Sequence, residues 1–305
     1  MRIRDSVPAN VVRWAINFRG QRPEIPRRYL FAALSRFTPA LAVDTEGLRL
    51  HLSTADRGVS LATFAAGAYE LPLLARVQEE LARRGSPGLH ARGFLDIGAN
   101  IGTATCLAIA RFGASRAWAF EPAPENLRLL RQNLLANGLE DRVSIHACAL
   151  TDHDGVVEFG LSDTNWGDHR VQPATGRDRE GRATLAVPAV RLDALTADRT
   201  VDLEAAGLAW IDVQGHEGHV LAGARSLLRS QVPIVCEYWP GALREAEGLE
   251  RFHELVATER AAFIDLGRPG STARPTGELG ALAREYESRR RRLTAAPSTD
   301  LLLLA

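Results

Sequence analysis

Two apolar segments, each ending in a turn, constrain the fold of this chain most strongly. The first, Phe94–Ile97, leads into the turn Gly98–Gly102, and the second ends in Phe120-Glu121-Pro122. Short apolar runs bounded by glycine are typical of buried parallel strands, and the glycines let the backbone turn sharply into a helix. Glu121 follows Asp96 by 25 residues, close to the spacing at which an acid meets ribose hydroxyls. The pattern predicts an open α/β sheet that binds an adenosine.

The glycine pattern of the first turn selects among adenosine cofactors. A nicotinamide or flavin site is expected to read G-x-G-x-x-G, whereas this turn has other residues at two of those glycine positions. A ligand without a diphosphate needs less open backbone, and a helix N-terminus favours a carboxylate by roughly 0.3–1 kcal/mol. We therefore predict a site for S-adenosylmethionine (SAM). Its predicted residues are Asp96, Gly98, Asn100, Gly102 and, at the ribose, Glu121.

The end of the third strand is expected to hold the adenine ring. This strand is predicted near residues 142–149, and Ala147 and Cys148 lie at its end. Their small side chains leave room for a flat ring. We therefore add Ala147 and Cys148 to the predicted cofactor site.

A fourth apolar segment, Leu208–Val213, ends in the polar run Gln214–Glu217. Together with four other motifs, it resembles the FkbM family of SAM-dependent methyltransferases from about Tyr69 to the end of the chain. Trp210 and Gln214 depart from the commoner family pattern Lys-Ile-Asp-Val-Glu-Gly-x-Glu. The other motifs are Asp96–Gly102, Ala119–Asn126, Asn137-Gly138 and Arg191-Leu192-Asp193.

The resemblance implies an α/β fold with a doubly wound, mostly parallel seven-stranded sheet, as in class I methyltransferases. Its last two strands would form an antiparallel hairpin at the sheet edge. It also implies transfer of a methyl group to oxygen. The acceptor would be a hydroxyl of a sugar, a glycoconjugate or a secondary metabolite, and a nitrogen acceptor is not excluded.

Apolar periodicity places the elements of this fold along the chain. A hairpin at Leu41–Leu52 and a helix at Leu73–Arg84 are expected in an N-terminal extension, residues 1–89, and the methyltransferase domain is predicted at residues 90–305. Strands are expected near 93–97, 116–120, 142–149, 208–213, 232–237, 261–266 and 299–305. Helices are expected near 103–112, 124–136, 217–229 and 246–258.

Three polar residues after the fourth and fifth core strands are candidates for the chemistry. Asp212 ends the fourth strand, where it would meet both the cofactor and the acceptor, and His216 follows one helical turn later as the candidate base. Glu237 ends the fifth strand, beside Asp212 in the expected sheet. Two carboxylates suit a hard cation, so Mg²⁺ at Asp212 and Glu237 is one hypothesis. Bonds from these acids to acceptor hydroxyls or backbone amides are the alternative.

A long polar segment between the third and fourth core strands, residues 160–182, is predicted to cover the acceptor site. Loops of this length are often functional, and the carboxyl ends of the strands are where ligands bind in open α/β sheets. A surface insertion is the alternative reading. The segment carries Asn165, Trp166, Asp168, His169 and Arg170.

Composition limits the other classes of function. The 305 residues contain 37 basic and 37 acidic side chains, which argues against a general nucleic-acid-binding surface. Three cysteines, an odd number spaced far apart, indicate core thiols in a reducing compartment. The sequence has no run of about 18 apolar residues, so we expect no membrane span and a cytoplasmic protein.

Residues 1–36 form a basic arm with eight arginines among apolar and aromatic side chains. Peripheral contact with an anionic membrane or a glycan is one interpretation. Packing on the catalytic domain, or on a second subunit of a homo-oligomer, is the other.

Two alternatives to the methyltransferase reading stay open at this point. An NAD-dependent sugar oxidoreductase is disfavoured by the missing glycines, and its Tyr-x-x-x-Lys motif cannot occur in a chain without lysine. A non-catalytic Rossmann-like binding module would have no reason to keep Asp96, Gly98 and Glu121.

Overall fold

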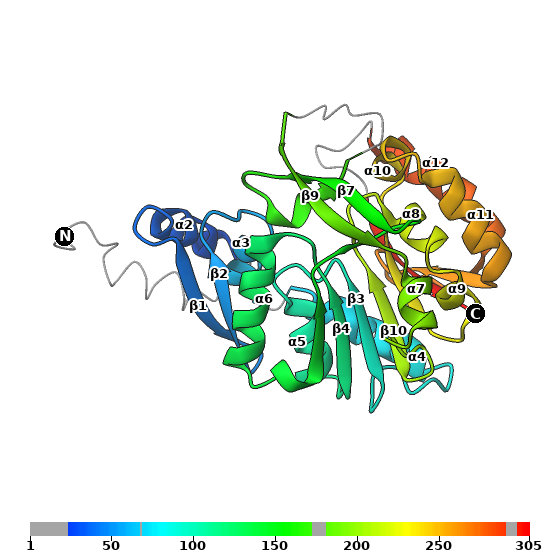
Figure 1. The fold of residues 1–305 in the computed structure, drawn as a ribbon, viewed down its shortest axis with the longest axis horizontal. Helices are drawn as coiled ribbons and strands as arrows, with labels where there is room; N and C mark the ends of the chain where they lie inside the picture. The colour runs from blue at the N-terminus through cyan, green and yellow to red at the C-terminus, as the bar shows by residue number, and fades with distance from the viewer. Residues whose placement is uncertain (1–23, 68, 173–180, 291–297) are drawn as a thin grey trace.

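The computed structural model describes residues 24–67, 69–172, 181–290 and 298–305. Within these ranges the chain forms a central eight-stranded sheet, a four-stranded sheet and a separate hairpin. Helices cover both faces of the central sheet (Figure 1). Most of the predicted basic arm, residues 1–23, lies outside the described residues.

The central sheet contains β3 (Gly93–Ile97), β4 (Arg116–Phe120), β5 (Val143–His146), β10 (Ala206–Ile211), β11 (Ile234–Tyr238), β12 (Ala262–Asp265), β13 (Arg274–Pro275) and β14 (Thr299–Leu304). The smaller sheet contains β6 (Ala149–Leu150), β7 (Gly155–Leu161), β8 (Arg170–Val171) and β9 (Ala183–Val190), and the hairpin contains β1 (Ala40–Thr45) and β2 (Leu48–Ser53). The α-helices are α2 (Glu24–Leu34), α3 (Val59–Ala66), α4 (Leu71–Ala82), α5 (Thr103–Ala110), α6 (Pro124–Ala136), α7 (Leu192–Ala197), α8 (Glu217–Ala222), α9 (Arg225–Arg229), α10 (Pro240–Glu245), α11 (Leu249–Glu259) and α12 (Leu279–Arg290). Short 3-10 helices are η1 (Glu140–Arg142), η2 (Trp166–Asp168) and η3 (Thr276–Glu278).

The strand order of the central sheet is β13-β12-β14-β11-β10-β3-β4-β5. The five strands from β11 to β5 are parallel, whereas β14 is antiparallel to both of its neighbours, β11 and β12. This order reverses between β3 and β10, which is the point where ligands bind in open sheets. The predicted doubly wound, mostly parallel sheet is confirmed. The two-residue strand β13 adds an eighth strand to the seven predicted.

Two apolar layers hold the helices onto the two faces of this sheet. Leu95 and Ile97 of β3 pack in the layer formed with α8, α9, α11 and α12, whereas Phe94 packs in the layer with α4, α5 and α6. Neighbouring residues enter different layers because successive side chains of a strand point to opposite faces. Each fully buried large apolar side chain contributes about 1.5–3 kcal/mol, so both layers stabilise the strand ends that carry the site.

The predicted hairpin and the predicted helix that follows it are both present, as β1–β2 and α4. The helix α4 packs on the sheet in the same layer as Phe94. The hairpin packs on α6, where Asn133 Oδ1 accepts from His51 N at 2.5 Å and Asn137 Oδ1 accepts from Arg49 N at 2.9 Å. The extension therefore packs closely against the rest of the chain, and the predicted division at residue 89 stays a prediction.

The helix predicted at 217–229 is interrupted, and the structure shows α8 and α9 instead. The break follows from Asp193, whose carboxylate accepts from Arg225 N at 3.0 Å and from Ser226 N at 2.8 Å. These are amides that the start of a new helix leaves without partners, so a carboxylate stabilises the second start. Gly223 at the break lies against the backbone of Thr151, where an added Cβ would come within 1.9 Å of the carbonyl oxygen.

The strand predicted at 142–149 is also divided, because the chain turns at Cys148, whose amide donates to His146 O at 3.0 Å. The residues beyond it form β6, which pairs with β9 in the smaller sheet. The long antiparallel pair β7–β9 extends this sheet across one end of the central sheet (Figure 1). Apolar periodicity did not predict the smaller sheet, because its strands leave many side chains exposed.

No α-helix within the described residues is long and apolar enough to cross a membrane. Cys106, Cys148 and Cys236 are buried and carry free thiols, as predicted for core cysteines.

Candidate active site

A cavity of about 240 Å³ lies at the carboxyl ends of β3, β4 and β10. The segments that follow these parallel strands meet there because all three strands end at the same edge of the sheet. Of the predicted site residues, Asp96, Gly98, Asn100, Glu121, Cys148, Asp212 and His216 line this cavity. Gly102, Ala147 and Glu237 are not among the lining residues.

The turn after β3 requires glycine at its first position. Gly98 has φ of +92°, and a Cβ added there would lie 1.9 Å from Asp212 O. The turn after β3 and the end of β10 therefore touch through bare backbone. Asp212 N also donates to Ile97 O at 3.0 Å, which fixes the two strand ends together.

Glu121 is held rigidly at the end of β4. Its Oε2 accepts from Asn100 N at 2.9 Å, and its Oε1 accepts from Ala123 N at 2.7 Å. Burial raises the pKa of this carboxyl to about 7. Each carboxylate oxygen can accept a second hydrogen bond, so Glu121 can still accept from ribose hydroxyls in the cavity.

The cavity wall between β3 and β10 is acidic. Asp96 is buried and accepts from the Thr105 hydroxyl, and burial raises its pKa to about 7. Asp212 follows β10, and desolvation of its carboxyl raises its pKa as well, although part of the residue is exposed. Glu70, at the start of α4, completes this wall. Sequence reasoning did not select Glu70. This residue lies near the start of the resemblance but in none of the motifs that carry it.

The charges of the cavity fit SAM better than a dinucleotide. No arginine is among the described residues that line it, and burial lowers the pKa of His169 to about 4 and of His216 to about 3. Both histidines are therefore neutral near pH 7. SAM brings a sulfonium and an ammonium group, which an acidic wall attracts, whereas it would repel the diphosphate of NAD.

Of the two residues predicted to contact adenine, only Cys148 lines the cavity. Cys148 lines the cavity, and burial raises the pKa of its thiol to about 11, so it stays protonated. Ala147 is exposed. Phe120 and Leu150 also line the cavity and supply apolar surface beside Cys148. Adenine contact at these positions stays a prediction.

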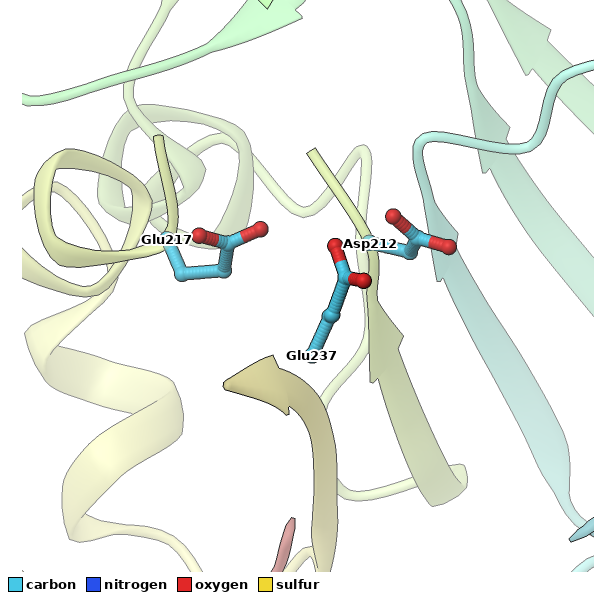
Figure 2. Close-up of side chains that lie close together, drawn as sticks. All are labelled: Asp212, Glu217 and Glu237. Atoms are coloured by element: carbon cyan, nitrogen blue, oxygen red, sulfur yellow. The ribbon is translucent and has the colours of Figure 1, made fainter. Parts of the chain in front are cut away.

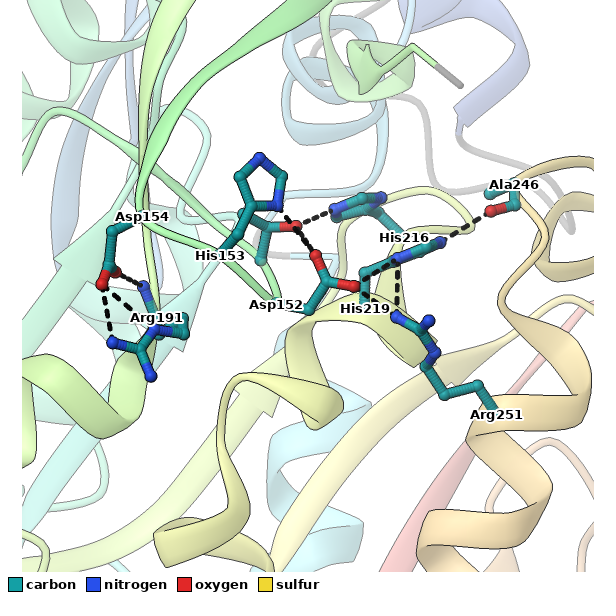
Figure 3. Close-up of polar contacts among 9 residues, drawn as sticks. Asp152, His153, Asp154, Arg191, His216, His219, Ala246 and Arg251 are labelled. Carbon is teal, nitrogen blue, oxygen red and sulfur yellow. Dashed lines mark hydrogen bonds and ion pairs between the residues drawn. The ribbon is translucent and has the colours of Figure 1, made fainter. Parts of the chain in front are cut away.

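His216 precedes α8 and belongs to a polar network beside the cavity (Figure 3). One of its ring nitrogens, Nε2, lies 2.9 Å from Thr151 Oγ1, and its ring stacks on His219 at 4.5 Å between centroids. Asp152 binds His153, His219 and Arg251 in the same network. A buried imidazole with a low pKa and one nitrogen already engaged is a weak base, so the proposed role of His216 stays a prediction.

Three carboxyl groups, those of Asp212, Glu217 and Glu237, lie close together at the ends of β10 and β11 and the start of α8 (Figure 2). One oxygen each from Asp212, Glu217 and Glu237 lies within 4.8 Å of the others. Gln214 stands where the commoner family pattern has glutamate, and its Nε2 donates to Asp212 Oδ1 at 2.6 Å and to Glu237 Oε2 at 2.9 Å. The chain therefore places an amide donor between two acids, where that pattern would add another acid.

Glu217 is the member of this cluster that sequence reasoning missed. It is 1% exposed, and its Oε1 accepts from Val213 N at 3.0 Å and from Gly215 N at 3.2 Å. Its Oε2 is buried and has no hydrogen-bond partner among the described residues. Burial raises the pKa of Glu217 to about 7, and burial with the neighbouring acids raises that of Glu237 well above its usual range. The sequence signals for Glu217 were the polar run after β10 and the last glutamate of the family pattern, which this residue matches.

The segment predicted to cover the site does lie over the cavity. Asn165, Gly167 and His169 line the cavity. Trp166 anchors the segment, since its amide donates to Asp56 Oδ1 at 3.0 Å and its carbonyl accepts from Asn100 Nδ2 at 3.1 Å. Residues 173–180 of the segment lie outside the described residues. Contact with an acceptor stays a prediction.

The sheet order and the cavity at its reversal define a class I methyltransferase fold. A model of the FkbM methyltransferase domain matches residues 96–260, more than half of the chain. The chain therefore belongs to the FkbM family of methyltransferases. The readings as an NAD-dependent oxidoreductase and as a non-catalytic module are set aside.

One curated relative is the 2-O-methyltransferase NoeI of Sinorhizobium fredii, 28% identical over 165 residues. The match covers 50% of this chain and 65% of that protein, which is less than two thirds of its length. Among solved structures, methyltransferase FkbM from Methylobacillus flagellatus is 14% identical, with a TM-score of 0.42 over 92% of this chain and 60% of that one. An O-methyltransferase from Bacillus cereus in complex with S-adenosylhomocysteine (SAH) is 16% identical. Its TM-score is 0.41, and the match covers 77% of this chain and 81% of that one.

Proposed function

We propose that this enzyme transfers the methyl group of SAM to a hydroxyl oxygen of a sugar, a glycoconjugate or a secondary metabolite. The observation that carries the proposal is Asp212, a carboxylate with a raised pKa at the strand end that faces the cavity. Such a group accepts a proton from a hydroxyl more readily than an ordinary carboxylate does. The 2-O-methyltransferase among the relatives supports oxygen as the acceptor atom.

In the proposed mechanism, bound SAM supplies a methyl group on a positively charged sulfur, which leaves as a neutral thioether. The protein must align the acceptor oxygen with this group and remove the hydroxyl proton. Well-oriented reactants can supply roughly 7–11 kcal/mol of the barrier, whereas a base supplies about 10²–10⁴-fold in rate. Glu121 and the Gly98 turn would fix the adenosine, and Asp212 would take the proton.

Methyl-labelled SAM tests the proposal directly. We expect purified enzyme to move label from the cofactor to a product in cell extract, and the labelled carbon to be bonded to oxygen when the product is examined by NMR. Enzyme heated beyond unfolding serves as the control. Label found on nitrogen or carbon would contradict the proposed acceptor class.

We further propose that Mg²⁺ binds at Asp212 and Glu237, the two residues indicated by the sequence, with Glu217 as a third ligand. The three carboxyl groups fit a hard cation, which prefers oxygen ligands, and the buried oxygen of Glu217 lacks another partner. A bound Mg²⁺ would polarise an acceptor hydroxyl. The carboxylates would hold the ion, and Gln214 would orient two of them.

Metal binding can be measured without an acceptor. We expect Mn²⁺, used as a paramagnetic substitute for Mg²⁺, to bind the wild-type protein and to bind Glu217→Gln at least tenfold more weakly, because the variant loses a charged ligand. Electron paramagnetic resonance titration gives both affinities. Glu250→Gln, at an exposed position of α11, is the matched control. Equal Mn²⁺ affinity of all three proteins, or indifference of turnover to a chelator, argues that the cluster holds no metal.

The remaining predictions concern the surroundings of the enzyme. The core cysteines and the lack of a long apolar run motivate the proposal of a cytoplasmic location. The arginine-rich residues 1–36 motivate the proposals of self-association and of peripheral contact with a membrane or a glycan.

A further inference from the structure

One acidic side chain of the cofactor cavity comes from the N-terminal extension. Glu70 immediately precedes α4, outside the residues 96–260 that the family model matches, and lines the cavity together with Asp96 and Asp212. The extension packs against the sheet through α4, so it places this carboxyl beside the turn after β3. The part of the chain that the family model matches therefore does not contain every acidic residue that lines the cavity.

The two oxygens of Glu70 have different surroundings. Oε1 accepts from the Tyr69 hydroxyl at 3.2 Å. Oε2 is buried and has no hydrogen-bond partner within the described part of the chain. Burial raises the pKa of this carboxyl to about 8, and the nearby hydroxyls of Thr103 and Tyr69 oppose the rise. A buried acceptor without a donor is costly, so a donor that arrives with a ligand would explain the arrangement.

The chemistry of SAM offers one suitable donor. Its sulfonium is positive but carries no hydrogen to donate, and its carboxylate is an acceptor that has none either. Its ribose hydroxyls belong at Glu121 in the proposed site. The α-ammonium group of its methionine part has three N–H donors and a positive charge, which match an unpartnered oxygen in an acidic wall.

We infer that Glu70 binds the α-ammonium group of SAM, so that the N-terminal extension completes the cofactor site. This inference rests on the proposed placement of the cofactor in the cavity. It assigns the extension a direct part in recognising the methionine half of the cofactor, whereas the turn after β3 and Glu121 recognise the adenosine half.

Two ligands distinguish recognition of the methionine half of the cofactor from recognition of the adenosine half. SAH carries the ammonium group, whereas 5′-methylthioadenosine lacks the whole amino-acid part. We expect Glu70→Gln to weaken SAH by about 10- to 100-fold, since a charge-assisted hydrogen bond is lost. Its affinity for methylthioadenosine should change less than twofold. Isothermal titration calorimetry at one pH measures all four values.

The matched control is Glu79→Gln, an exposed position on the same helix that should leave both affinities unchanged. Glu70→Asp keeps the charge on a shorter side chain and should lose less SAH affinity than Glu70→Gln. It also provides a test if Glu70→Gln does not fold.

Three results would overturn the inference. Unchanged SAH affinity in folded Glu70→Gln shows that the carboxyl does not meet the ammonium group. Equal losses for SAH and methylthioadenosine show that Glu70 only shapes the cavity. Failure of the wild-type protein to bind either ligand overturns the proposed cofactor placement itself, and with it this inference.

Discussion

We expect Asp212→Asn to lower turnover by about 10²–10⁴ and to leave the affinity for SAH within a few-fold of the wild-type value. The expected loss is that of a base, because an amide of nearly the same shape cannot take the hydroxyl proton. SAH is the right ligand for the comparison, since its neutral sulfur does not interact with the charge at Asp212 as a sulfonium would. Steady-state kinetics with labelled SAM and calorimetry with SAH give the two numbers.

The pH profile adds a second signature to this prediction. Asp212 acts as a base only when ionised, and its pKa is raised in the metal-free protein, so turnover measured without divalent cations should rise with pH through that higher pKa. In Asp212→Asn this rise should disappear, while the residual rate stays low. A variant that retains the same profile shows that another group titrates.

His216→Ala is the comparison that decides between the two candidate bases. Its imidazole is neutral near pH 7, and its Nε2 already interacts with Thr151, so we expect a smaller loss than for Asp212→Asn. A full loss in His216→Ala together with nearly normal turnover in Asp212→Asn would contradict our assignment. The histidine would then be the base, as the sequence alone suggested.

Local sequence predicted the parallel core because the residues that mark its strands and helices are compatible with few other structures. Gly93–Ile97 is apolar and bounded by glycine, and the chain forms β3 with the same limits. Pro124 can start a helix but cannot continue one from before, and α6 begins there. These signals are local, so a single sequence reveals them.

The parts that sequence reasoning missed depend on contacts between distant residues. Glu70 precedes Asp96 by 26 positions in the chain, and only the packing of α4 on the sheet brings the two acids into one cavity. The break between α8 and α9 depends on Asp193, from a segment more than thirty residues earlier. The importance of Glu217 follows from an oxygen without a partner, which no sequence pattern records.

Gly98→Ala is expected to be the most damaging small substitution in the cofactor site. The added methyl group meets two obstacles, the positive φ of +92° and the Asp212 carbonyl oxygen 1.9 Å away. A left-handed conformation costs a residue with a side chain roughly 1–2 kcal/mol, and forced overpacking typically costs about 1–3 kcal/mol more. We therefore expect the free energy of unfolding to fall by about 2–5 kcal/mol, and SAH affinity to fall at least 100-fold because the turn must move.

Gly47→Ala measures the cost of the positive φ alone, without a steric clash. Gly47 lies in the β1–β2 turn with φ of +76°, and a Cβ added there would meet no atom within 4 Å. This variant should therefore lose only the conformational part, about 1–2 kcal/mol, and should bind SAH normally. Urea denaturation and calorimetry of both variants measure the difference, which isolates the close approach of the β3 turn to β10. Equal destabilisation of the two variants, with SAH affinity retained in Gly98→Ala, would mean that this approach does not constrain the site.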